Sequence, residues 1–339
     1  MRHFTLLRSP WLSLCVGLLL MSSLAACSST ESASDEAAEP APVERPAWDQ
    51  GNDTYLLRLA PESGATYETQ HTQQIDQTLL VQGNEIDVTQ DQTITQELRV
   101  ANYTAEGVTT LESTITRMQV NFDSMGNAMS YDSDAEDNSN AGPLSDVIGP
   151  MVGKALQFEL DQQGEFVGNP DTLAAQVDSL MGDAGTGGMS DPSMLVEPLM
   201  SQFRFYPSTP VAVGDSWDIE TELDMGVPFT VDATYTLDEV NDAVATIDIA
   251  IDLNTDGSTI DLGQIEADAF LSGTQTGTLT LDLDSGLLQS MEQSGSISGF
   301  AEFTPPNQNE PIEMDMDINS TVSFQAERMT DSADASAAE

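Results

Sequence analysis

Three oxygen-bearing side chains at alternate positions could hold a calcium ion. Asp252, Asn254 and Asp256 precede Gly257, which matches the first half of an EF-hand calcium loop. The second half does not match, because the position that should carry a bidentate glutamate is Gly263. Asn, Asp and Gly are also typical of a hairpin turn. We therefore expect a turn at residues 254–257, keep the three residues as weak calcium candidates and predict no cofactor.

Side chains for nucleophilic or acid–base catalysis are scarce. His71 is the only histidine after His3, and its Thr and Gln neighbours predict an exposed strand position. Gly214-Asp215-Ser216-Trp217 superficially resembles the serine block of the GDSL-type esterases, but that family needs a later histidine and none follows residue 71. A glycosidase needs only two carboxylates, yet aromatic residues for sugar binding make up only 6% of the chain. We expect a protein that is not an enzyme.

The N-terminal segment has the features of a bacterial export signal. Arg2 and Arg8 form a positive region, and the apolar run 11–21 is too short to span a bilayer as a permanent helix. The following Leu24-Ala25-Ala26-Cys27 resembles the bacterial lipobox. The resemblance implies cleavage of a signal peptide over 1–26, a diacylglyceryl thioether on the Cys27 sulfur and an acyl chain such as palmitate on its amino group. The alternative is a plain secretory signal with an incidental cysteine.

The residues after the lipobox indicate where the protein resides. In Gram-negative lipoproteins of this type, an Asp after the lipidated cysteine tends to retain the protein at the inner membrane. Ser28 stands there instead, so the resemblance implies the outer membrane, without distinguishing its periplasmic face from the cell surface. Residues 27–53 are rich in Ser, Ala, Glu and Pro, which predicts an acidic disordered tether. Residues 328–339 form a similar polar tail.

The net charge excludes several classes of partner. The chain has 57 acidic residues against 9 Lys and Arg, for a formal charge of −48, and Lys154 is its single lysine. A nucleic-acid-binding protein needs a basic surface to displace counterions, so no nucleic-acid partner is expected. The membrane partner is expected through the Cys27 anchor alone, because anionic headgroups would repel this chain. Adaptation to a saline habitat and simple solubility both account for the acidity.

Alternating apolar and polar residues dominate residues 54–327. The segment from Ile247 to Leu253 places apolar side chains on one face and mostly acids on the other, which is typical of an antiparallel sheet with one solvated face. Gln82-Gly83-Asn84 and Asp284-Ser285-Gly286 read as turns between strands. We predict a β-dominated α+β domain with an antiparallel meander sheet, either an open half-barrel or sandwich-like.

A helical segment is predicted at residues 143–205, covering one face of the sheet. Asn169-Pro170-Asp171 has the pattern of a helix N-cap followed by Pro at the first helical position. Eight of the fifteen methionines fall between Met118 and Met200. Methionine suits adaptable apolar surfaces, so these residues either fill the core or form a movable cover. The second reading resembles the half-barrel lipoprotein carriers, which hold acyl chains between sheet and lid.

The order of segments resembles uncharacterised β-rich envelope lipoprotein families of unknown function. A lipobox and tether precede a β-rich domain, and a Gly-Asp-x-Trp strand start, here 214–217, follows a helical middle. The resemblance covers residues 54–326 and implies a class without an activity. Our leading hypothesis is a structural or interaction role, and the alternative is a carrier or sensor of an apolar ligand. A packed interior would favour the first, and an apolar cavity of several hundred Å³ the second.

Overall fold

The fold is known from a computed structural model. It describes residues 45–142, 144–145, 149–181, 203–224, 228–255, 257–261, 266–304 and 311–329. Several predicted features lie outside these ranges, namely the lipobox with Cys27, the tether before residue 45, the acidic residue Asp256 and the tail from residue 330. Among the described residues, no helix is long and apolar enough to cross a membrane.

Two antiparallel sheets contain all the described strands. The small sheet has the order β1-β2-β8, from β1 (Asp49–Gly51), β2 (Thr54–Tyr55) and β8 (Val211–Ala212). The strands of the large, twelve-stranded sheet are, along the chain, β3 (Thr66–Val81), β4 (Asn84–Tyr103), β5 (Thr109–Ser124), β6 (Asn127–Asp132), β7 (Ala155–Leu160), β9 (Ser216–Asp224), β10 (Pro228–Asn241), β11 (Val244–Asn254), β12 (Ser258–Asp261), β13 (Glu266–Asp282), β14 (Leu288–Phe303) and β15 (Ile312–Arg328).

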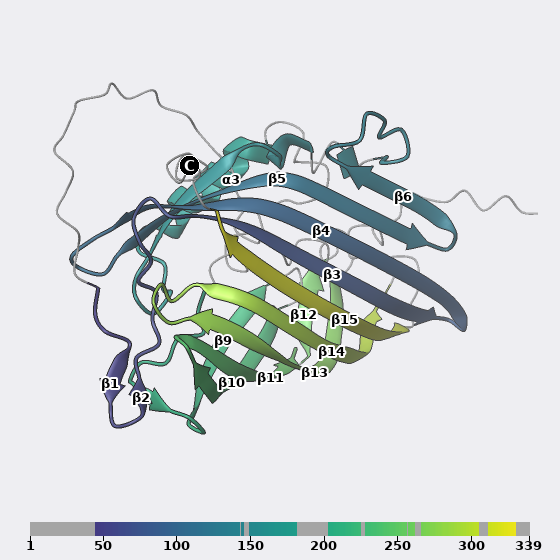
Figure 1. Cartoon of the computed structure of the whole chain (residues 1–339). Helices are drawn as coiled ribbons and strands as arrows, with labels where there is room; N and C mark the ends of the chain where they lie inside the picture. Colours follow the sequence, from purple (N-terminus) through teal and green to yellow (C-terminus); the bar gives the residue numbers. More distant parts are fainter. Residues whose placement is uncertain are drawn as a thin grey trace, which may run out of the picture.

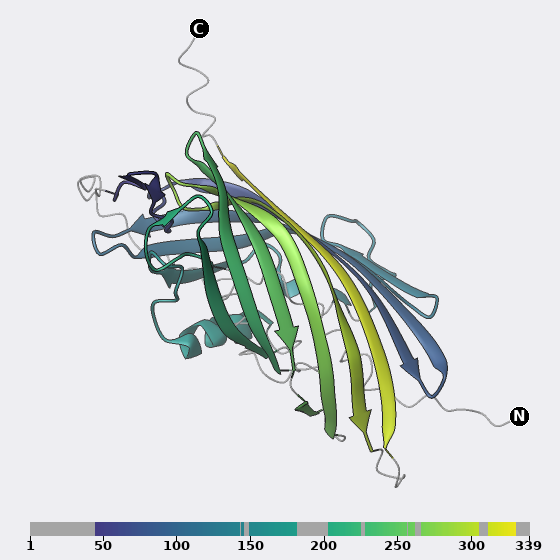
Figure 2. The ribbon, with the colours of Figure 1, turned by 90° about the horizontal axis from the view of Figure 1, so that it is seen from below.

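The large sheet is a meander joined in its middle by a pairing between distant parts of the chain. Its main path runs β6-β5-β4-β3-β15-β14-β13-β11-β10-β9, so the last strand pairs with the first long one. The register of that pairing places Phe324 opposite His71 and Val322 opposite Gln73. The sheet curls so strongly that β3–β5 and β9–β11 lie on opposite sides of a concavity (Figures 1 and 2). The sheet is open, with β6 and β9 at the ends of its path, which confirms the predicted β-dominated, half-barrel fold.

Strand alternation separates an inner, concave face from an outer one. On β11, Ile249 and Leu253 are buried on the inner face, whereas Asp248 and Asp252 are exposed on the outer face. The buried apolar side chains form two clusters. Cluster one includes Ile94, Leu279 and the helix residues Leu173 and Val177, and cluster two includes Ile75, Leu253, Leu271 and Ile297.

Glycines allow β13 and β14 to approach each other closely where the sheet bends. A Cβ atom added to Gly277 on β13 would lie 2.2 Å from the carbonyl oxygen of Glu292 on β14. A Cβ added to Gly295 on β14 would lie 2.4 Å from the carbonyl oxygen of Thr274. Real Cβ atoms do not approach backbone oxygens this closely, so no larger residue fits without a shift of the strands.

The helical part of the described chain is small. The helix α3 (Pro170–Met181) begins as predicted, because the Asn169 side chain accepts a hydrogen bond from the Asp171 amide at 3.0 Å. Leu173 and Val177 on α3 are each 1% exposed and face the core. The short 3₁₀ helix η2 (Gly149–Met151) contributes the buried Met151. Met189, Met194 and Met200, which were expected either to fill the core or to form a movable cover, lie outside the described residues.

The hairpin turn predicted at residues 254–257 is only partly right. The Ser258 amide donates to the Thr255 carbonyl at 2.9 Å, which closes a turn one residue later than predicted, but β11 and β12 do not form a hairpin, because both pair with β13. Thr255 stays paired with β13, since its amide donates to the Leu271 carbonyl at 3.0 Å and its hydroxyl accepts from the Leu271 amide at 2.9 Å. β12 then continues along β13, with Ser258 opposite Ala269. The Asn, Asp and Gly residues therefore mark an irregularity between two strands that share one neighbour.

Ordered contacts extend slightly beyond the expected domain boundaries at residues 54 and 327. The Trp48 indole donates a hydrogen bond to the Asp284 carboxylate at 2.9 Å and stacks on Tyr55 with ring centroids 6.1 Å apart. At the other end, the Arg328 guanidinium contacts the Glu62 carboxylate at 2.7 Å. The folded domain therefore includes residues assigned to the tether and to the tail.

Candidate binding cavity

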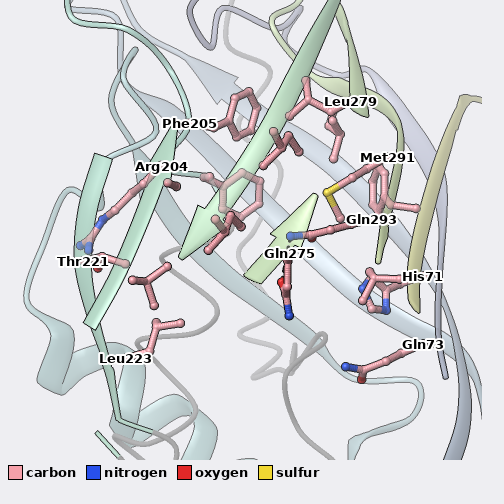
Figure 3. A pocket seen from close by; sticks show the side chains of 18 of the residues that line it. His71, Gln73, Arg204, Phe205, Thr221, Leu223, Gln275, Leu279, Met291 and Gln293 are labelled. Carbon is pink, nitrogen blue, oxygen red and sulfur yellow. Dashed lines mark hydrogen bonds between the residues drawn. The ribbon is translucent and has the colours of Figure 1, made fainter. Parts of the chain in front are cut away.

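The concave face of the large sheet encloses a cavity of about 340 Å³. Its lining comes from β3–β5, β7, β9–β11 and β13–β15, together with residues 203–206. Most of the lining side chains are apolar, and Leu223, Leu279 and Met291 are among those drawn in Figure 3. The volume lies within the range of about 300–1,000 Å³ that is typical of ligand pockets. This is the kind of interior that the sequence analysis associated with a carrier.

Residues 203–206 cross the concavity and contribute three aromatic side chains to the lining. Phe203 packs on Phe158 of β7 with ring centroids 5.6 Å apart, and Phe205 stacks on Tyr206 at 4.3 Å. The buried Tyr206 hydroxyl donates to the Gly286 carbonyl at 2.6 Å, and burial raises the pKa of Tyr206. These contacts fix the segment against the strands.

Trp217 links this segment to the edge of the sheet. Its indole donates to the Phe205 carbonyl at 2.9 Å and stacks on Tyr235 with centroids 5.8 Å apart. Burial raises the pKa of Tyr235 to about 12. The neighbouring Ser216 hydroxyl shares a hydrogen bond of 2.8 Å with Thr236 on the exposed face. Ser216 is therefore an exposed strand residue, and Trp217 is partly buried against cluster one.

The prediction that His71 is an exposed strand residue is wrong. His71 lies on the inner face of β3, lines the cavity and is mostly buried (Figure 3). Burial lowers the pKa of its imidazole from 6.5 to about 4, so the ring is neutral at pH 7. Its Nδ1 atom is buried and has no hydrogen-bond partner among the described residues. Among the described lining residues there is no Asp or Glu, so none of them supplies a carboxylate that could orient this histidine as a general base.

Glutamine side chains are the main polar groups of the cavity, and none of them was predicted from the sequence. Gln73, Gln275 and Gln293 all face inward (Figure 3), and the Gln293 amide donates to the Gln275 carbonyl oxygen at 2.9 Å. A signal for Gln73 was present in the sequence, because it has the same parity along β3 as the apolar Ile75 and Leu79. Side chains of one parity share a face.

The calcium candidates are not brought together as a recognisable site. Asp252 and Asn254 are exposed at the end of β11, while Asp256 lies outside the described residues. Among the described residues, no group of three or more His, Cys, Asp or Glu side chains could hold a metal ion. The Cys27 candidate for lipidation also lies outside the described part of the chain.

The fold and the cavity define a class of protein, an open antiparallel half-barrel with an apolar interior. The chain belongs to a family of unknown function, DUF6263, whose model matches residues 106–288, more than half of the 339 residues. The comparison with curated proteins gave no match.

Resemblances to solved structures are weak. A lipovitellin structure described as showing lipid–protein interactions has a TM-score of 0.44 and 11% identity, and the match covers 78% of this chain and 25% of the lipovitellin chain. This chain therefore spans about a quarter of the length of that protein. OccK7 (OpdD) of Pseudomonas aeruginosa has a TM-score of 0.23 and 7% identity, with 79% and 100% of the two chains covered. Such values identify no shared function.

Proposed function

We propose that this protein is a membrane-anchored envelope lipoprotein whose β domain carries or senses an apolar ligand. The observation that supports the ligand is the cavity of about 340 Å³, with its apolar lining from ten strands and residues 203–206. A scaffold that only contacts other proteins needs no such interior space, because protein cores are ordinarily packed to crystal-like density. The carrier hypothesis, second in the sequence analysis, therefore becomes the preferred one.

We infer a non-enzymatic role. Within the part of the chain that the structure describes, the lining includes a single histidine and no Asp or Glu. General acid–base catalysis needs a side chain that exchanges protons near neutral pH, whereas His71 stays neutral because burial lowers its pKa to about 4. The cavity is suited to holding a molecule without changing it.

The ligand is tested by filling the cavity. Ala233 on β10 is buried and lines it, whereas the adjacent Thr234 is exposed on the outer face. We expect the polypeptide 28–339, secreted into a bacterial envelope and purified gently, to retain a non-covalent lipid. Native mass spectrometry and solvent extraction should show several-fold less of this lipid in Ala233→Trp than in Thr234→Trp, because an indole fills much of the cavity. A wild-type chain that carries no extra mass would contradict the carrier role.

The anchor is tested at the two cysteines. We propose that Cys27 carries the lipid, since three acyl chains give firm attachment to the outer membrane. Cys27→Ser should abolish the incorporation of an alkyne analogue of palmitate, detected by click labelling. Cys15→Ser, within the signal peptide, should label like wild type and serves as the matched control. Full labelling of the Cys27→Ser chain would show that the lipobox reading is incorrect.

A further inference from the structure

The inner face carries a belt of glutamines at mid-height. The belt consists of Gln73, Gln90, Gln92, Gln275 and Gln293, from strands β3, β4, β13 and β14. Gln92 lies opposite Gln73 in the β3–β4 register, and Gln73 and Gln293 both lie opposite Val322 on β15. Gln73, Gln90 and Gln92 are only 4%, 5% and 1% exposed. Glutamine is seldom buried so completely, so a group of them on one concave face is unusual.

The belt lies between the two apolar clusters. On β13, Gln275 is between Leu271 of cluster two and Leu279 of cluster one. On β14, Gln293 is between Met291, which packs against cluster one, and Ile297 of cluster two. On β13 and β14 the inner face therefore has an apolar zone, a polar belt and a second apolar zone, in that order along the strands.

Part of the hydrogen-bonding capacity of this region is unused within the described residues. The Nδ1 atom of His71, which lines the cavity, is buried without a hydrogen-bond partner there. The bond between Gln293 and Gln275 uses one amide nitrogen and one carbonyl oxygen, so the other nitrogen and oxygen of the pair can bind a ligand. Buried polar atoms without partners are unfavourable, and a ligand with hydroxyl or carbonyl groups would satisfy them.

The described lining residues offer no unpaired countercharge to an ionised ligand. Arg204 is the single charged side chain among them, and its guanidinium already contacts the Glu165 carboxylate at 3.1 Å. The His71 imidazole is neutral at pH 7 because burial lowers its pKa to about 4. A carboxylate, phosphate or ammonium group placed at the belt would lose its hydration without gaining an ion pair, which is strongly unfavourable.

We infer that the ligand is an uncharged lipid whose hydroxyl or ester groups hydrogen-bond to the glutamine belt while its hydrocarbon chain contacts the apolar clusters. This inference rests on the proposed carrier function and specifies the chemistry of the ligand. Glutamine suits such a ligand because its amide both donates and accepts hydrogen bonds.

The test compares the binding of ligands that have hydrocarbon chains of the same length but different head groups. The polypeptide 28–339, which contains every described residue, is loaded with the uncharged fluorescent probe N-phenyl-1-naphthylamine. Monolauroylglycerol, laurate and dodecyltrimethylammonium then displace the probe at pH 8, below their micellar concentrations. We expect monolauroylglycerol to act at concentrations about tenfold lower than either charged ligand, roughly the effect of one or two hydrogen bonds.

Substitutions in the belt test whether its glutamines cause the preference for the uncharged ligand. Gln293→Leu and Gln275→Leu should each bind the probe and lose most of the preference for monolauroylglycerol. Gln70→Leu, the same change on the exposed outer face of β3, should keep it. Circular dichroism of both belt variants establishes that they fold.

The possible results distinguish a failure of the inferred uncharged ligand from a failure of the proposed carrier function. If the probe binds but all three ligands displace it equally, or if laurate is preferred, the carrier function stands and the uncharged ligand is wrong. A preference that survives in both belt variants would also overturn the inference. If neither the probe nor any ligand binds, both the inference and the carrier function are wrong.

Discussion

Gly277→Ala should destabilise the domain by about 2–3 kcal/mol, although a Gly-to-Ala change at an unstrained position usually stabilises a protein by about 0.4–1 kcal/mol. The added methyl group would lie 2.2 Å from the Glu292 carbonyl oxygen and 2.8 Å from the Gln293 Cα. Both contacts are backbone atoms of β14, so neither can move without distorting the pairing of the two strands. The midpoint of urea unfolding measures the effect.

The adjacent residue provides the control for this prediction. Thr278 lies on the exposed outer face of β13, and Thr278→Ala should change stability by less than about 0.5 kcal/mol. Gly295→Ala, on the facing strand, should repeat the loss, because its Cβ would lie 2.4 Å from the Thr274 carbonyl oxygen. If all three variants unfold at the same urea concentration as the wild type, the close approach of β13 and β14 does not require glycine at positions 277 and 295.

Local patterns of the sequence predicted the local elements of this fold. Alternation on β11 identified its buried and exposed faces. Gln82 and Gly83 form the predicted turn between β3 and β4, both with positive φ angles, 51° and 80°. Asn169 caps α3 as expected. These features depend on residues close together in the chain, so a single sequence contains the information that determines them.

Features that depend on distant residues could not be predicted in this way. The pairing of β15 with β3 joins strands at opposite ends of the domain, and nothing in either segment specifies the other. The hairpin predicted around residues 254–257 does not form for a similar reason, because β11 and β12 both pair with β13, the next long strand. A local turn signal does not reveal whether a neighbouring strand will continue across the irregularity.

The polar residues of the cavity were missed because they were judged by their neighbours. The segment Thr69-Gln70-His71-Thr72-Gln73 is polar throughout, so it predicts an exposed strand. The face on which a side chain lies depends instead on its position in the strand alternation. Thr69, His71 and Gln73 have the same parity as the buried Ile75 and so lie on the inner face. Polar residues on the inward parity of a strand deserve consideration as cavity residues, and glutamines at 73, 275 and 293 follow this rule.

Acid should destabilise the wild-type protein relative to a His71→Gln variant. The pKa of His71 is about 4 in the folded state, below the value of about 6.5 expected in the unfolded chain. The unfolded chain therefore binds more protons between these values, so the contribution of the neutral imidazole is complete above pH 6.5 and falls as the pH approaches 4. Between pH 7.5 and 5.0 the wild type should lose about 2 kcal/mol more unfolding free energy than the variant.

Comparison with the His71→Gln variant separates the effect of the histidine on the pH dependence of stability from the effect of the many carboxylates. The 57 acidic residues are the same in both chains, so their titration contributes equally and cancels in the difference. Urea unfolding at the two pH values gives the free energies, and the proton resonances of the single imidazole in the polypeptide 28–339 give its pKa directly. Parallel stability curves for the two chains, with an imidazole pKa near 6.5, would place His71 in water instead of on the inner face. A pKa near 4 with diverging curves would support a buried, neutral His71, as the belt's preference for uncharged ligands requires.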